Sequence, residues 1–144
     1  MLSAISGADF AVFLLIVDKK GRKIPDTPEN YSVLAGELIK EIHIWQNRGL
    51  MIFIDKHFHR ILDENSFNAH LQKSLTGIPY TIEHVNSQEE IAVNLADFVA
   101  GASLAKYNKN TEQFYGMIKE SIIFEKIINW PELKRKSLHE SKIS

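Results

Sequence analysis

Apolar residues occur along this chain in two patterns: short continuous runs, and longer segments with an apolar residue at every third or fourth position. Short runs rich in β-branched and aromatic residues are typical of strands covered on both faces, and the spaced pattern is typical of amphipathic helices. The continuous runs predict strands at residues 10–17, 50–54 and 80–85. The spaced segments predict helices at residues 28–49, 63–75, 88–104 and 111–128.

Capping and breaking residues support these boundaries. Thr27 is suited to cap the first helix, because its hydroxyl can accept a hydrogen bond from a free backbone N–H, and Pro28 then takes the first helical position. Residues 76–79 contain Gly and Pro and separate a helix from a strand. We expect Trp130-Pro131 to end the last helix, and the polar residues 131–144 to form a tail that frays.

The predicted order is strand, helix, strand, helix, strand, helix, helix. Strands that alternate with helices argue for right-handed strand-helix-strand units, and therefore for an α/β fold with a mostly parallel sheet. The length of 144 residues is usual for one domain, and no internal repeat or low-complexity linker divides it. We expect a single α/β domain at residues 1–130, followed by the polar C-terminal tail at 131–144.

Composition narrows the functional classes. The chain has no cysteine, which excludes disulfides, thiolate metal sites and cysteine nucleophiles, and which suits a cytoplasmic protein. It has no glycine-rich phosphate loop, no nucleophile elbow and no His-Glu-x-x-His segment. The apolar run at 10–17 is too short to span a bilayer, so no membrane association is expected. The net charge of -1 gives no overall attraction to nucleic acid, although the basic run at 19–23 could contact phosphate locally.

Asp97 is the most conspicuous candidate site residue, because it is the sole charged residue in the run 91–105. A helix this apolar should be covered on most sides, and an isolated charge there would oppose folding by roughly several kcal/mol. A cation, a metal ion or a hydrogen-bond cluster would offset that cost. The alternative is that Asp97 lies on a narrow solvent-exposed stripe with Asn94, or forms a structural salt bridge.

Asp55 follows a buried strand, at the edge where open α/β sheets bind their ligands. The alternative is an ordinary turn residue. Together, Asp55 and Asp97 would form an oxygen-rich site for Mg²⁺ or Mn²⁺, which could position a metal-bound water and a phosphate. Glu37, with Glu41 one helical turn later, could supply a third carboxylate, although glutamates on a helix surface are usually solvated.

Two further segments carry candidate binding residues. His57 and His59 alternate, so in an extended segment both imidazoles would point to one side and could contact a metal or a phosphate. Two histidines in a polar loop more often simply titrate in solvent. Ser87 stands where a strand gives way to a helix, and capping of that helix would by itself explain its presence.

Three segments, taken together and in this order, resemble a large uncharacterised family of RNase H-like proteins. They are Ile-Phe-Ile-Asp at 52–55, Val-Asn-Ser at 85–87, and Asn-Leu-Ala-Asp-Phe-Val-Ala-Gly at 94–101. The last segment is similar to that family's leucine-alanine-aspartate helix with its following alanine-glycine. The resemblance spans residues 10–105. It implies a ribonuclease H-like fold, acidic residues that bind divalent metal, and nuclease activity.

The chain matches only the C-terminal part of this family's pattern. Members begin with a strand that carries Asp-Glu-Ser-Gly, which is absent here, and three strands would precede the first helix where this chain has one. The first catalytic carboxylate would then be missing. We therefore expect a partial RNase H-like fold that is a fragment, has a rearranged strand order, or is completed by a second copy in a homodimer.

Two functional hypotheses follow. The first is a metal-dependent RNase H-like nuclease or phosphodiesterase, or a degenerate remnant of one. In it, Asp55 and Asp97 would be catalytic and hold the metal, supplemented by Glu37. His57 and Ser87 would contact the substrate, for which nucleic acid is the candidate. The second hypothesis is a non-catalytic binding or assembly module with the same fold.

Overall fold

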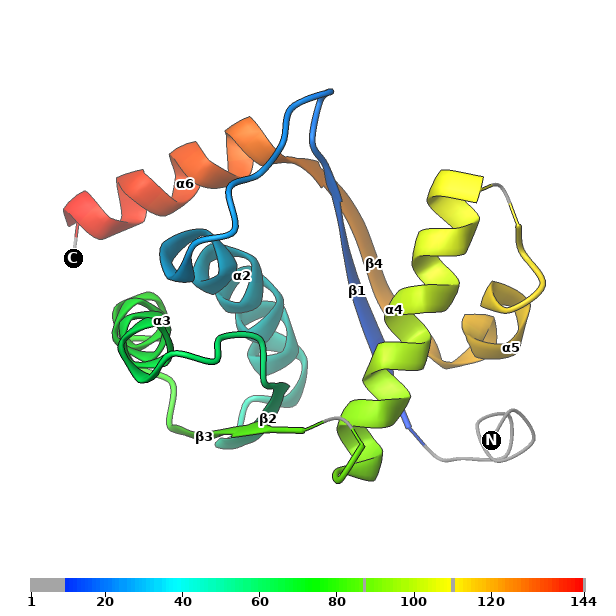
Figure 1. The fold of residues 1–144 in the computed structure, drawn as a ribbon, viewed down its shortest axis with the longest axis horizontal. Coiled ribbons are helices and arrows are strands. Elements are labelled where there is room, and N and C mark those ends of the chain that lie inside the picture. The colour runs from blue at the N-terminus through cyan, green and yellow to red at the C-terminus, as the bar shows by residue number, and fades with distance from the viewer. Residues whose placement is uncertain (1–9, 87, 110, 144) are drawn as a thin grey trace. The chain divides into compact units, whose positions relative to one another are not determined.

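The structure is a computed structural model that describes residues 10–86, 88–109 and 111–143 (Figure 1). Its strands are β1 (Val12–Asp18), β2 (Leu50–Asp55), β3 (Tyr80–Val85) and β4 (Ile122–Asn129). Its helices are α2 (Pro28–Gln46), α3 (Ile61–Ser74), α4 (Ile91–Lys109), α5 (Tyr115–Ile118) and α6 (Trp130–Ile143), with a 3-10 turn at Lys119–Ser121. The fold is therefore mixed α/β, as the sequence predicts. No helix within the described ranges is long and apolar enough to cross a membrane.

The elements predicted up to residue 109 are confirmed in type and order. The start of α2 follows from its capping residues: Thr27 is extended, and its hydroxyl accepts a hydrogen bond from the Asn30 backbone N–H at 3.2 Å. Pro28 takes the first helical position, where no hydrogen-bonding N–H is needed. The helix ends before Asn47, which adopts a left-handed conformation (φ 50°) and donates its N–H to the His43 carbonyl.

The strands pair in two short parallel sheets rather than in one, which corrects the expectation of a single mostly parallel sheet. In the described part of the chain, β1 pairs with β4 and β2 pairs with β3. The Leu50 N–H donates to the Pro79 carbonyl at 3.0 Å, and the Lys56 N–H donates to the Val85 carbonyl at 2.8 Å. These two bonds keep the same sequence offset along both strands, as a parallel pair requires.

The helix predicted at residues 111–128 is wrong. A short helix, α5, is followed by strand β4, in which half-buried and exposed side chains alternate for most of its length. Its sequence, Ile-Ile-Phe-Glu-Lys-Ile-Ile-Asn, is rich in β-branched residues, which favours a strand. The apolar positions also fit a helical spacing over so short a run, so periodicity alone could not separate the two. Pairing with β1, far away in sequence, selects the strand.

The frayed tail expected from residue 131 is also wrong, because residues 130–143 form α6. Trp130-Pro131 begins this helix instead of ending the previous one. The Asn129 side-chain oxygen accepts a hydrogen bond from the Glu132 backbone N–H at 2.9 Å, as a capping residue does. Leu133 is almost fully buried, so α6 belongs to the packed structure.

The chain divides into two compact units. Unit 1 contains residues 10–13, Ile52–Lys56 and the described part of 82–124. Its buried apolar residues include Val93, Val99, Ala102, Tyr115 and Ile118. Unit 2 contains Leu14–Met51, His57–Thr81 and residues 125–143. Its core is formed where α2 and α3 pack on each other and on α6, and it buries Val33, Ile39, Phe67, Leu71, Leu75 and Leu133.

Candidate functional site

Asp97 is exposed on α4, so the burial expected of it is not observed. The helix buries four side chains, those of Val93, Val99, Ala102 and Ser103. The remainder of α4 is largely open, including Ile91 and Leu104. Asp97 makes no hydrogen bond or ion pair with another described residue, and an exposed carboxylate needs none. The Asp97 carboxylate is therefore accessible to solvent ions, and the fold does not require a cation beside it.

Asp55 is the last residue of β2 and is also exposed, without a polar partner among the described side chains. Alternation along the strand places it on the same side as Met51 and Phe53, which are exposed too. The parallel register puts Glu83 of β3 on that side as well. The exposed side of the β2–β3 pair thus carries two carboxylates, Asp55 at the end of β2 and Glu83 within β3.

Asp55 and Asp97 both belong to unit 1, whereas Glu37 belongs to unit 2. The described residues contain no group of three or more His, Asp or Glu side chains that could hold a metal ion. Any ion at Asp55 or Asp97 would therefore take most of its ligands from solvent or from a bound molecule.

Glu37 is buried in α2, with a side chain 6% exposed, and its carboxylate forms an ion pair with Lys136. The Lys136 ammonium on α6 donates a hydrogen bond to the Glu37 carboxylate at 2.8 Å. A buried carboxylate needs such a cation, because taking the charge out of water costs several kcal/mol of folding free energy. The attraction between the two charges of a buried pair is of the same order and offsets this cost. Glu37 therefore acts in holding α6 against α2. Glu41, one turn further on, is half-buried.

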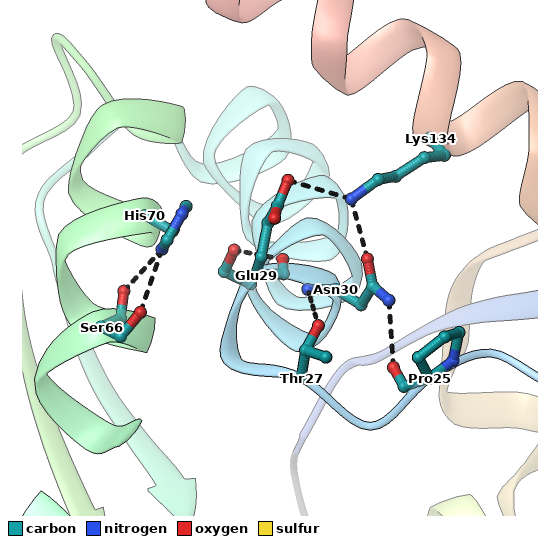
Figure 2. A network of polar contacts seen from close by, with 8 residues as sticks. Pro25, Thr27, Glu29, Asn30, Ser66, His70 and Lys134 are labelled. Carbon is teal, nitrogen blue, oxygen red and sulfur yellow. Dashed lines mark hydrogen bonds and ion pairs between the residues drawn. The ribbon is translucent and has the colours of Figure 1, made fainter. Parts of the chain in front are cut away.

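A second lysine of α6 joins the same helix (Figure 2). The Lys134 ammonium donates to Glu29 at 3.1 Å and to the Asn30 side-chain oxygen at 2.8 Å. The Asn30 amide in turn donates to the Pro25 carbonyl at 3.0 Å. Two of the cations in the run 134–136 are therefore used within unit 2, which makes this run a structural element rather than a free patch for phosphate.

The other basic run, at 19–23, forms a tight turn whose side chains are all exposed. The Arg22 N–H donates to the Lys19 carbonyl, and Lys20 and Gly21 between them have positive φ angles of 54° and 72°. A backbone hydrogen bond from Lys20 holds the pKa of Asp18 below its usual value, and the nearby Lys20 ammonium adds to this effect. On β3, burial raises the pKa of Tyr80.

His57 is held by three contacts that the sequence did not reveal. Its Nε2 lies 2.7 Å from a carboxylate oxygen of Asp26. Its ring stacks on Tyr31, with the centroids 4.5 Å apart, and meets the Phe58 ring edge to face at 4.7 Å. An ionised carboxylate only accepts hydrogen bonds, so Nε2 is the donor and Nδ1 is left with a free lone pair when the ring is neutral. Asp26 is a site residue that no local motif could indicate, because it precedes His57 by 31 positions.

Ser87 lies outside the described residues, so its predicted role as a helix cap is neither supported nor opposed. Asn86, the described residue after β3, bonds to the described residues that precede α4. The Asn86 side-chain oxygen accepts a hydrogen bond from the Gln88 N–H at 3.0 Å, and its carbonyl accepts from the Glu89 and Glu90 N–H groups. An asparagine in this position is a common turn former.

Compared with family models, with curated proteins and with solved structures, the chain matches none of them. The resemblance to RNase H-like proteins therefore depends on the three short segments alone.

Proposed function

We propose that this chain is a non-catalytic assembly module whose partner is a second copy of itself. The observation that carries this proposal is the exposure of large apolar side chains at alternate positions of two strands. On β2, Met51 is 76% and Phe53 38% exposed, and on β4, Ile123 is 47% and Ile127 59% exposed. Parallel strands are normally covered on both faces, and clustered apolar exposure is typical of an interaction surface.

The strands also have unpaired edges. Within the described part of the chain, each strand has one hydrogen-bonded neighbour. A two-stranded pair is marginally stable by itself, and its free edges present N–H and C=O groups to any additional strand. A strand from another chain would satisfy these groups at an edge, and a second layer packed on the face of the strands would cover the exposed apolar positions.

A second copy is the partner that the charge balance favours. With a net charge of -1, two copies repel each other weakly. Twofold dimers are the commonest oligomers, and their interfaces use the same surface on both subunits. An apolar strand face suits a twofold interface, because the same apolar surface on the second subunit can pack against it.

The experiment compares self-association of the native chain with that of a Phe53→Ser/Ile127→Ser variant by sedimentation velocity. We expect the native chain to sediment as a dimer and the variant as a smaller species at the same concentration. Leu138→Ser, which removes an exposed leucine from α6, is the matched control and should leave the dimer intact. A dimer that persists in the double variant would overturn the role given to the strand faces.

A second candidate is the metal-dependent RNase H-like phosphodiesterase, or a degenerate remnant of one. It is favoured by the exposed, unpaired carboxylates of Asp55 and Asp97, which lie in the same compact unit. Mg²⁺ or Mn²⁺ at these residues would polarise a phosphate and orient an attacking water. His57 and Ser87 are the proposed substrate contacts and nucleic acid is the proposed substrate.

The test is a nuclease assay on single- and double-stranded DNA and RNA with Mg²⁺ or Mn²⁺. This mechanism requires cleavage that is lost in both Asp55→Asn and Asp97→Asn. Glu112→Gln, which removes an exposed carboxylate from the same unit, should cleave as the native chain does. Equal activity in Asp97→Asn and the native chain would rule the mechanism out.

A further inference from the structure

The tight turn after β1, at residues 18–23, concentrates positive charge on the surface of unit 2. Every residue of this turn is exposed. The Asp18 carboxylate accepts a hydrogen bond from the Lys20 N–H at 2.8 Å and lies 3.5 Å from the Lys20 ammonium. The side-chain cations of Lys19, Arg22 and Lys23 make no hydrogen bond or ion pair with another described residue. Like charges this close repel one another, and an anionic surface on another molecule would relieve that repulsion.

The exposed side of the β2–β3 pair carries the opposite charge. Asp55 and Glu83 are both exposed there, and neither has a hydrogen-bond or ion-pair partner among the described residues. The hydrogen-bond register of the parallel pair places Glu83 next to Phe53. Met51 lies on the same side and is also exposed. The two carboxylates therefore border the apolar residues of β2 that the proposed self-association would cover.

These two surfaces belong to units of opposite charge. In unit 2, which contains the turn, Lys and Arg outnumber Asp and Glu. In unit 1, which contains Asp55 and Glu83, Asp and Glu outnumber Lys and Arg. Two copies with almost no net charge can therefore still attract each other locally, through unit 2 of one and unit 1 of the other. The basic run at 134–136 is less available for this, because two of its cations form ion pairs inside unit 2.

We propose that the basic turn of one copy contacts Asp55 and Glu83 of a second copy and thereby sets how the two copies align. This inference rests on the proposed self-association through the exposed strand faces. In a twofold dimer the contact forms twice, because each chain offers both surfaces. Complementary charges beside an apolar interface speed association and select one orientation of the partners. A second copy fits the turn better than a nucleic acid does, because a polyanion would leave the two carboxylates close to further negative charge.

The experiment reverses the charge of each surface and then mixes the variants. The turn variant is Lys19→Glu/Lys23→Glu, and the carboxylate variant is Asp55→Lys/Glu83→Lys. In each variant alone, like charges would meet at the contact, so the dissociation constant of the dimer should rise at least about tenfold in sedimentation velocity at low salt. An equimolar mixture should restore the native dissociation constant, because the acidic turn of one chain meets the new lysines of the other, and the reverse.

Control variants separate this contact from the effect of net charge. Lys73→Glu/Arg135→Glu in unit 2 and Glu112→Lys/Glu120→Lys in unit 1 make the same charge changes at other exposed positions. Both controls should dimerise like the native chain. Raising the salt concentration from about 0.05 M to about 0.5 M should weaken the native dimer about tenfold, because the shorter screening length reduces the attraction. Circular dichroism of each variant confirms that it is folded.

The outcomes distinguish this contact from the proposed function. A native chain that stays monomeric would overturn both. A native dimer that neither charge reversal weakens would overturn this contact alone. So would a dimer restored in one chain that carries all four substitutions but not in the mixture, because the contact would then form within a chain. A turn variant that dimerises like the native chain but loses binding to DNA would assign the turn to nucleic acid instead.

Discussion

Helices α2 and α4 have the same length of 19 residues but treat their carboxylates in opposite ways. In α2, Glu37 is buried and paired with Lys136. In α4, Asp97 is exposed and unpaired within the described structure, although its surroundings in the sequence are far more apolar. The burial of a carboxylate therefore depends on what packs on the helix, and not on how apolar the helix is.

The difference arises from the neighbours of each helix. The α2 helix packs against both α3 and α6. At Gly36 the approach is so close that an added Cβ would lie 2.6 Å from the Ser74 hydroxyl. The principal helical neighbour of α4 is the short α5, so much of its apolar surface is uncovered. Around Glu37, α2 is therefore covered by helices of its own unit, whereas α4 keeps much of its apolar surface exposed.

The largest loss of stability is expected at Leu133, through which α6 packs into the core of unit 2. Leu133→Ala removes a buried side chain of α6 and should lower the free energy of unfolding by about 3 kcal/mol, as is usual for a leucine truncated in a core. Urea denaturation measures this change. Leu138→Ala on the exposed side of the same helix is the control and should change stability by less than about 0.5 kcal/mol. Equal effects of the two would contradict the packing of α6.

The next effect concerns the ion pair. Lys136→Met leaves the Glu37 carboxylate buried without its cation, and breaking a buried pair usually costs about 3–5 kcal/mol. Because Lys136 is 46% exposed, water can partly replace the ammonium, and we expect a loss nearer about 2 kcal/mol. Adding Glu37→Gln should restore part of it. If Lys73→Met, an exposed control on α3, were equally destabilising, the ion pair would have no special role.

A smaller effect is expected at the start of α6. Asn129→Ala removes the oxygen that accepts the Glu132 N–H, and should cost about 1 kcal/mol, the typical value of a helix cap. Thr27→Ala at the start of α2 should cost a similar amount for the same reason. Thermal unfolding of the two variants provides the measurement. An unchanged stability in Asn129→Ala would mean that α6 does not begin at this cap.

The smallest effect is expected in α4. Asp97→Asn should change the free energy of unfolding by less than about 0.5 kcal/mol in the absence of added metal, because the carboxylate is exposed and unpaired. Chemical denaturation at neutral pH measures it. A loss above about 1.5 kcal/mol would show that Asp97 has a buried partner, and the contrast with Glu37 would fail.

Local signals predicted much of this fold, and long-range contacts account for what was missed. Thr27 and Pro28 marked the start of α2 correctly. Asn129 and Pro131 give the same kind of signal for α6, but the apolar run before them predicts a helix, and Trp130-Pro131 then predicts the end of that helix. That run became β4 through its pairing with β1, which no local pattern shows.

In the candidate site, too, local signals predicted some features, and long-range contacts account for the features that were missed. Asp55 at the end of a strand was predicted from the strand itself. The partner of Glu37 is 99 residues away, and the partner of His57 is 31 residues away, so neither pair has a spacing that local structure dictates. For Asp97, burial was inferred from the composition of its helix, but exposure is set by the elements that cover the helix.

The most direct test of self-assembly is the molar mass of the native chain, measured by light scattering over an about hundredfold range of concentration. The account predicts twice the 16.5 kDa of one chain at high concentration, falling toward 16.5 kDa on dilution. A well-folded chain that keeps a mass of 16.5 kDa throughout would contradict it, because the exposed strand faces would then be stable without a partner.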